Sequence, residues 1–404
     1  FLAHLVHIRA QLPKLKFILP LGISYYTLQA AGYIIDVYRG KYRATENFGK
    51  LALFLSFFPQ IVEGPIGRYD LLADNLYEGH SFDYDRTAFA LQRIVWGLFK
   101  KMVIADRANI FVSEVFGDYQ KYSGSIILLG GVLYTLQIYA EFSGCMDIVI
   151  GSAELFGVPL SQNFSRPFFS KSVAEFWRRW HITLGAWLRD YVFYSVSLSK
   201  PFMKLSRFAK EHLNEFLGSL IPASFAMFFT WFGIGFWHGA GWKYIIYGLY
   251  YYAAMMLGMY LEPLFARAFN AAHINRNSKP LNALRILRTL ILVVCGMTLF
   301  RAETVGIWLG MIKRVFTGFG GGTFLNDALL CGMDKQDFLI VILGAAVMLV
   351  ISILQEKGIN VRDTLAKQVL PVRWTVYICL VLSVIIFGAY GIGYDAVDFI
   401  YGQF

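Results

Sequence analysis

The chain has 404 residues, of which 57% are hydrophobic and only 16% are charged. A soluble domain usually carries about 25% charged residues, so this composition excludes an ordinary soluble globular protein and indicates an integral membrane protein. The net charge of +10 fits cytoplasmic loops enriched in Lys and Arg. We therefore expect the lipid bilayer as a partner and no nucleic acid, since no basic globular face is visible.

Apolar stretches of nearly spanning length recur along the whole chain. A spanning helix needs roughly 20 mostly apolar residues, and open strand edges cannot face lipid, so the stretches are predicted to be helical. We expect an all-α, multi-pass protein with about nine to eleven membrane segments. The long stretches are 17–35, 126–139, 221–237, 244–261, 287–300, 338–354 and 376–392, and shorter or broken ones are 51–66, 94–104 and 187–196.

Nothing in the sequence divides the chain into separate parts. It has no repeat, low-complexity tract or long polar linker, so residues 1–404 are expected to form one membrane domain. The four cysteines, at positions 145, 295, 331 and 379, lack the close pairing of metal or redox motifs. Three of the four lie in or beside apolar runs, so we interpret them as small core residues, with a disulfide as the alternative, and we expect no metal site.

Several polar residues interrupt the apolar stretches of the first half of the chain. Glu141 and Asp147 lie in one such stretch, and Gln60, Glu63 and Arg68 surround a Pro-Gly break. Acids at membrane depth usually pair with bases. The arginines of the segment described next are the expected partners.

The segment Glu175–Asp190 has the sequence EFWRRWHITLGAWLRD, with three arginines, three tryptophans and one histidine. Helical spacing predicts one apolar face that includes the histidine. The arginines would then reach water or headgroups while the histidine turns inward, although a simple interfacial anchor is the alternative. The residues of the predicted face are Trp177, Trp180, His181, Leu184 and Leu188, and the arginines are Arg178, Arg179 and Arg189.

A basic amphipathic stretch follows at residues 195–216. Apolar residues spaced for one helical face alternate with lysines and an arginine, which is typical of a helix lying in the cytoplasmic interface. The apolar residues are Phe202, Leu205, Phe208 and Leu213, and the basic residues are Lys204, Arg207 and Lys210.

His238 ends the apolar stretch that begins near Ile221. Glycines at positions 233, 235, 239 and 241 surround it, and glycine permits close approach of a backbone or a ligand. Ionisable groups at membrane depth tend to face a cavity or pathway, so His238 is a candidate functional residue. The alternative is a packed histidine at a helix end.

The chain lacks the GxSxG, P-loop, HExxH and EF-hand patterns, so hydrolase, ATPase, zincin and calcium-binding functions have no support. Histidine chemistry in a membrane cavity remains. A neutral imidazole can take the proton of a hydroxyl as its oxygen attacks an acyl donor, and the ordinary pKa of histidine suits this near neutral pH.

At these residues the chain resembles the membrane-bound O-acyltransferase (MBOAT) family, in particular the bacterial polysaccharide O-acetyltransferases of the alginate and peptidoglycan type. The similarity covers nearly the whole chain. The most specific block is residues 139–194, which includes RRWH, and a second block, FWHGAGWKY, begins at Phe236. Weaker blocks are residues 19–40, 57–72, 299–316 and 398–404.

The resemblance implies a ring of tilted helices around a transmembrane tunnel, and transfer of an acyl group to a hydroxyl. It implies His238 as the main catalytic histidine and His181 as the second. Substrate contacts would come from Trp177, Arg178, Trp180, Trp237 and Asp190.

The resemblance also implies substrates, partners and a location. A cytoplasmic acyl thioester, either acetyl-CoA or an acyl carrier, would be the donor, with no bound cofactor. The acceptor would be an exported polysaccharide, reached directly or through an extracytoplasmic SGNH-type acetyltransferase, and the location would be the bacterial cytoplasmic membrane.

Two departures from the family pattern affect these expectations. The Pro-Leu-Gly-Gly run that many members carry after Arg-Asp-Tyr is replaced here by DYVFYSVSLSKPF, and we expect that N-terminal helices of the family are missing. An alternative function is D-alanyl transfer to teichoic acid from an acyl carrier protein, although that branch tends toward Asn-Arg-Trp-His. An alternative of another class is a channel or transporter with a histidine gate, which would favour paired repeats.

Overall fold

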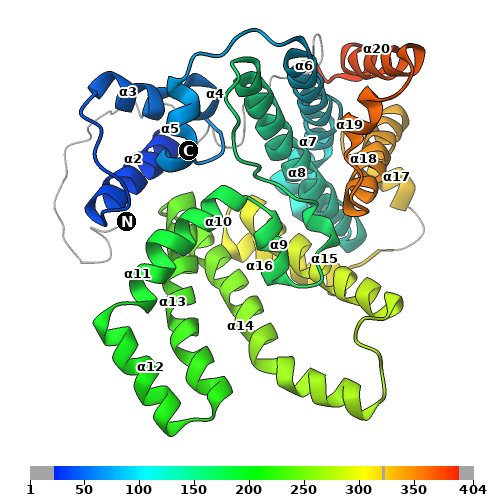
Figure 1. Ribbon diagram of the computed structural model, residues 1–404. Helices are drawn as coiled ribbons and strands as arrows, with labels where there is room; N and C mark the ends of the chain where they lie inside the picture. Colours follow the sequence, from blue (N-terminus) through cyan, green and yellow to red (C-terminus); the bar gives the residue numbers. More distant parts are fainter. Residues whose placement is uncertain (1–21, 321–323, 391–404) are drawn as a thin grey trace, which may run out of the picture.

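The computed structural model describes residues 22–320 and 324–390, and these residues form helices joined by short connections (Figure 1). Within these ranges, strand-like pairing is limited to one isolated bridge between Phe164 and Trp180. The expected all-α class is therefore confirmed. The start of the 17–35 stretch, the end of the 376–392 stretch and the 398–404 block lie outside the described residues.

In the first half of the chain, α4, α6 and α7 pack against the long helix α8. Short π-helical segments follow α6 and α10, at Phe99–Ala105 and Arg189–Phe193. The helices are α2 (Ile23–Tyr38), α3 (Phe48–Ser56), α4 (Phe58–Ile61), α5 (Tyr69–Tyr77), α6 (Tyr84–Leu98), α7 (Asp106–Gly117), α8 (Gly124–Leu155), α9 (Val173–Arg179), α10 (Ile182–Leu188) and α11 (Tyr194–Ser197).

The second half contains longer helices. They are α12 (Lys200–His212), α13 (Glu215–His238), α14 (Trp242–Ala271), α15 (Lys279–Arg301), α16 (Val305–Thr317), α17 (Phe324–Leu329), α18 (Lys335–Glu356), α19 (Val361–Ala366) and α20 (Leu370–Phe387).

Five of the described helices, α8, α13, α15, α18 and α20, are long and apolar enough to cross a membrane. The expectation of about nine to eleven segments also includes shorter, re-entrant and tilted stretches, so that number stays a prediction. The shorter stretches fold as helices, but α3 and α4 are separate short pieces, and the stretches at 94–104 and 187–196 pass into the π-helical segments.

Helix α8 occupies the centre of the fold, while α18 and α20 lie at its edge (Figure 1). In the most apolar part of α8, 67% of residues are buried, against 17% in α18 and 6% in α20. Two helices that are this apolar and this exposed are suited to contact with lipid chains. The central helix instead contacts protein on most sides, including α6, α7 and α15.

Helices α6 and α8 approach each other closely at a pair of glycines. A Cβ atom on Gly97 would lie 2.5 Å from the Gly144 carbonyl oxygen, and one on Gly144 would lie 2.8 Å from the Gly97 carbonyl oxygen. Small residues permit such backbone contact between membrane helices. The close approach brings the basic residues that follow Gly97 against the acids of α8.

A buried ion network joins these helices beside the glycines. Asp147 on α8 pairs with Arg93 at 2.9 Å and with Lys100 at 2.6 Å. Lys100 also donates to Ser143, and Arg93 donates to Gln162. Each buried charge therefore has an opposite charge or a polar partner, which offsets much of its desolvation cost.

A second network involves Glu141, which precedes Asp147 on α8. Lys101 pairs with Asp106 at 2.6 Å and with Glu141 at 3.4 Å. Glu63 lies nearby, where its carboxylate accepts from the Cys145 thiol at 3.6 Å. The expectation that Glu141 and Asp147 pair with the arginines of Glu175–Asp190 is therefore wrong, because α6 and its π-helical continuation supply closer bases.

The basic amphipathic stretch forms α12, as its periodicity predicts. This helix packs alongside α13, a candidate membrane span (Figure 1). Lys204, Arg207 and Lys210 are exposed on it. The structure contains no membrane, so the position of α12 at the cytoplasmic surface stays a prediction.

We predict that Asp147→Asn strongly destabilises the protein. The substitution leaves the Arg93 and Lys100 charges buried without their counterion, which typically costs about 3–5 kcal/mol. Asp118→Asn is the matched control, because Asp118 pairs with Lys121 at the surface. Thermal unfolding of the detergent-purified variants should show a large loss for the first and little for the second. Equal stability of the two variants would contradict this account of the network.

Candidate active site

The helix predicted over Glu175–Asp190 is broken at its histidine. Helix α9 ends at Arg179, α10 begins at Ile182, and His181 between them adopts a left-handed backbone with φ of 48° and ψ of 51°. The prediction of a single helix with one apolar face is therefore wrong. Periodicity could not reveal the break, because the stretch carries no Gly or Pro at that position.

A neighbouring loop supplies the hydrogen bonds that the broken helix loses. Residues Asn163–Ser165 run antiparallel to the break. The Ser165 amide donates to the Arg179 carbonyl at 2.9 Å, and the Ile182 amide donates to the Asn163 carbonyl at 3.0 Å. Backbone groups at a buried helix end need such partners, so this loop stabilises the unusual backbone at His181.

The break turns His181 into the protein, where only 4% of its surface is exposed. Its ring meets the Phe142 ring of α8 edge to face, with centroids 4.8 Å apart. Its Nδ1 atom lies 3.3 Å from the Asn163 side-chain oxygen. His181 is therefore a buried, held side chain, and not an incidental histidine on an interfacial helix.

His238 reaches the same region from the end of α13. Gly239 ends that helix with a φ of 151°, and a Cβ there would clash with the Tyr244 ring at 2.7 Å. A glycine is thus required directly after the histidine. His238 is 7% exposed, and the Phe300 and Tyr247 rings lie 5.1 and 5.8 Å from its ring.

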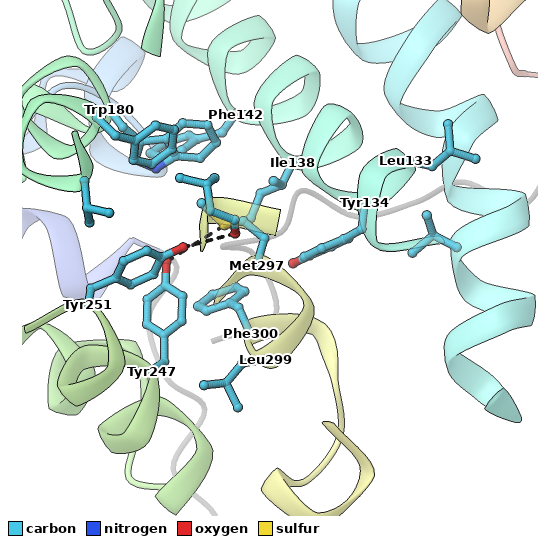
Figure 2. Close-up of a cluster of buried hydrophobic side chains, with 14 of the residues drawn as sticks. Leu133, Tyr134, Ile138, Phe142, Trp180, Tyr247, Tyr251, Met297, Leu299 and Phe300 are labelled. Atoms are coloured by element: carbon cyan, nitrogen blue, oxygen red, sulfur yellow. Dashed lines mark hydrogen bonds between the residues drawn. The ribbon is translucent and has the colours of Figure 1, made fainter. Parts of the chain in front are cut away.

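Both histidines line one cavity of about 50 Å³ among α8, α9, α10, α13, α14 and α15. Figure 2 shows part of its wall, where Tyr247 of α14 and Met297 and Phe300 of α15 face Ile138 of α8. The lining residues are Ile138, Trp177, Trp180, His181, Leu184, Gly185, Trp231, Ile234, His238, Tyr247, Met297 and Phe300. The wall is largely aromatic and aliphatic, so the two imidazoles are its main basic groups.

A second, smaller cavity of about 20 Å³ meets His238 from the side of α2. It is lined by Gly22, Ile23, Ser24, Tyr25, Val62, Trp237 and His238. The Trp237 ring lies 4.8 Å from that of His238 and 6.0 Å from that of His181. His238 therefore stands between two cavities, and Trp237 contacts both histidines.

Arg178 and Asp190 do not share this location. Arg178 is exposed, and neither residue is part of the cavity lining described above. Asp190 pairs instead with Arg68 at 2.5 Å and with Arg189 at 2.8 Å. Because Arg68 also donates to the Ala186 carbonyl, this pair joins the Pro-Gly break to α10.

Arg179 also departs from its predicted position. It was expected to reach water or headgroups, yet it is only partly exposed and pairs with Glu175 at 2.8 Å and with Glu356 at 3.1 Å. Arg166 pairs with the same Glu356. These ion pairs join the end of α18 to the region of the helix break.

The sequence analysis did not identify several residues of the site. Tyr247, Met297 and Phe300 lie in apolar stretches whose every position is a plausible core residue, so no pattern separates the cavity wall from the core. Asn163 was missed because it stands alone in a loop 18 residues before His181. A polar residue buried to 1% exposure can be recognised only once the loop is placed.

The arrangement is suited to proton transfer at a hydroxyl. Each imidazole has a nitrogen that can accept a proton, and the apolar wall leaves few competing polar groups. General bases must lie within hydrogen-bond reach of the reacting group, and a small acyl group and a hydroxyl could both approach His238 from its two cavities.

Residues 43–296 match the model of the membrane-bound O-acyltransferase family. A probable alginate O-acetylase of Pseudomonas aeruginosa is 36% identical over 319 residues, which cover 78% of this chain and 55% of that protein. The peptidoglycan O-acetyltransferase of Helicobacter pylori is 29% identical over 357 residues, covering 81% and 61%. The teichoic acid D-alanyltransferase of Bacillus subtilis is 29% identical over 264 residues, covering 64% and 63%. The chain thus matches little more than half the length of these relatives.

We predict that the stability of the protein depends on how well the residue at position 181 tolerates a left-handed backbone. Every substitution loses the packing of the buried ring, so the informative comparison is between variants of similar size. Asparagine tolerates the left-handed conformation, whereas a β-branched residue is strained there, so His181→Val should be about 1–2 kcal/mol less stable than His181→Asn. Thermal unfolding in detergent measures the difference. A His181→Val variant as stable as His181→Asn would contradict the left-handed backbone.

Proposed function

Because the chain belongs to the membrane-bound O-acyltransferase family, we propose that it transfers an acyl group, most simply acetyl, from a thioester to hydroxyls of an exported polysaccharide. The observation that carries the proposal is the pair of buried histidines in one apolar cavity, one from the break between α9 and α10 and one from the end of α13. Its apolar helices agree with a multi-pass membrane protein. The bacterial cytoplasmic membrane is the proposed location.

In the proposed reaction, His238 acts as the general base. Its imidazole takes the proton as the hydroxyl oxygen bonds to the thioester carbonyl carbon. The carbon–sulfur bond then breaks, and the proton passes to the departing sulfur, leaving an ester and a free thiol. Exclusion of water by the aromatic wall would limit hydrolysis of the thioester.

The donor is proposed to be a thioester from the cytoplasm, carried by coenzyme A or by an acyl carrier protein. The acceptor would be the polysaccharide itself or a hydroxyl of an extracytoplasmic SGNH-type partner that passes the acyl group on. Two cavities that meet at His238 support such a reaction, because they would let the two substrates approach from different directions.

D-alanyl transfer to teichoic acid is the second candidate within the family. A D-alanyltransferase relative matches a smaller share of the chain than the O-acetylating relatives do. The Arg-Arg-Trp-His sequence at Arg178–His181 also favours acetylation. A channel or transporter would release no thiol from any thioester, so the same assay separates all three functions.

The central experiment offers purified protein in lipid nanodiscs three donors, namely acetyl-CoA, an acetylated carrier protein and a D-alanylated carrier protein, with polysaccharide fragments as acceptor. Release of free thiol and mass spectrometry of the polysaccharide measure transfer. Acetylation of the polymer supports the proposal. D-alanylation would favour the second candidate, and failure of every donor, with and without the cognate extracytoplasmic partner, would argue against both.

We predict that His238→Ala abolishes transfer while the protein still inserts and purifies normally. A general base typically contributes about 10²–10⁴-fold, and an amide cannot replace it, so His238→Asn should be equally inactive. His80→Ala is a suitable control, because His80 is an exposed histidine that does not line the cavity. Near-normal transfer by a well-folded His238→Ala variant would exclude the proposed role.

We predict that Gly185→Phe blocks the reaction without unfolding the protein. Gly185 lines the cavity, and the nearest atom to an added Cβ would be the Trp177 carbonyl oxygen at 3.9 Å, so a side chain can enter the space. Displacing the substrate by 1 Å can cost about 10²-fold in rate. Gly233→Phe is the matched control, since a Cβ there meets no atom within 4 Å and the residue does not line the cavity. Equal activity of the two variants would place the reaction elsewhere.

A further inference from the structure

The Asn163 side chain lies directly against the ring of His181. It precedes α9 in a loop and is 1% exposed. Its side-chain oxygen lies 3.3 Å from His181 Nδ1 and accepts hydrogen bonds from the Thr183 amide and hydroxyl, each at 3.0 Å. One amide oxygen thus contacts both the histidine and the first turn of α10.

The orientation of the Asn163 amide is determined by its surroundings. Its nitrogen donates to the Met146 sulfur at 3.2 Å, while backbone and hydroxyl donors of Thr183 surround its oxygen. An amide nitrogen could not accept from the Thr183 backbone N–H. The oxygen therefore faces His181, and the nitrogen faces α8.

This contact extends to the Pro-Gly break that the sequence analysis singled out. The Ile66 amide, between Gly64 and Gly67, donates to the Thr183 hydroxyl at 3.0 Å, and that hydroxyl donates to Asn163. The Asn163 backbone carbonyl also accepts from the Ile182 amide. Asn163 is therefore held by Ile182 and Thr183, the two residues that directly follow the break at His181.

The chemistry of an amide oxygen limits what His181 can do. A carbonyl oxygen only accepts hydrogen bonds, so the Nδ1 atom beside it must carry the hydrogen. In a neutral imidazole the other nitrogen, Nε2, then has a lone pair and acts as an acceptor. The partner of one ring nitrogen thus selects the function of the other.

We propose that Asn163 is a positioning residue, which holds His181 in the Nδ1–H form so that Nε2 accepts a hydrogen bond from a hydroxyl of the acceptor. The proposal deepens the proposed function and rests on it. In this form His181 cannot donate to the thioester carbonyl, so it orients the hydroxyl substrate and does not polarise the donor. No covalent bond changes at His181, and the reacting proton goes to His238.

The direct test is nuclear magnetic resonance of the full chain labelled with ¹⁵N and ¹³C in its seven histidines. The two neutral forms of histidine have distinct nitrogen and ring-carbon shifts, and a His181→Asn sample identifies the His181 signals. We expect hydrogen at Nδ1 in the wild type. Hydrogen at Nε2 would overturn the proposal, whatever the activity of the protein.

Variants at position 163 provide the second arm. Asn163→Asp keeps an accepting oxygen and should keep hydrogen at Nδ1, whereas Asn163→Leu removes the acceptor and should move hydrogen toward Nε2. Transfer by Asn163→Leu should fall about 10- to 100-fold, as is typical when the partner that orients a buried histidine is lost, and Asn163→Asp should retain more activity. An unchanged His181 spectrum in folded Asn163→Leu would overturn the proposal.

Two further measurements separate the possible failures. If Asn163→Leu does not fold, Thr183→Val is the milder variant, because it removes only the hydroxyl between Ile66 and Asn163. The wild-type spectrum alone still decides which ring nitrogen of His181 carries the hydrogen. If His181 carries hydrogen at Nδ1 but the wild type uses no donor, the proposed function fails while the contact with Asn163 stands. If transfer occurs but His181 carries its hydrogen at Nε2, the proposed function stands and the positioning role of Asn163 fails.

Discussion

The left-handed backbone at His181 is the constraint on which the rest of the site depends. A continuous helix through this residue would direct its side chain by the same periodicity as its neighbours. The break instead lets α9 and α10 diverge and turns the imidazole toward α8 and α13. Such a conformation persists only when its surroundings support it, and here the loop at Asn163–Ser165 provides the hydrogen bonds.

The helices around this break are held together by close backbone contacts and buried ion pairs. Gly97 and Gly144 let α6 approach α8, and Gly248 lets α14 approach α13, where a Cβ would lie 2.2 Å from the Trp231 carbonyl oxygen. Near the first two of these glycines, Asp147 of α8 pairs with Arg93 of α6 and with Lys100 of the π-helical segment that follows α6. Lipid chains supply no hydrophobic force between helices, so packing and polar contacts must hold the helix that carries Phe142 beside His181.

The two histidines occupy different chemical positions in this arrangement. His238 ends a helix, is surrounded by aromatic rings and adjoins two cavities. His181 lies in a break and has Asn163 on one ring nitrogen. The proposed reaction uses this difference, with His238 receiving the proton and His181 orienting the hydroxyl. Two identical side chains can thus perform separate tasks because their neighbours differ.

The sequence by itself determined the all-α membrane class, the family, and His181 and His238 as candidates. Composition, the length of apolar stretches and local motifs can be recognised without knowing which residues are in contact. Only the tertiary structure decided that Asp147 pairs with Arg93 and Lys100, and that Asn163 reaches His181. Each of these contacts forms between segments that lie apart in the chain. A periodic pattern shows which face of a helix is apolar, but it does not show which residues that face contacts.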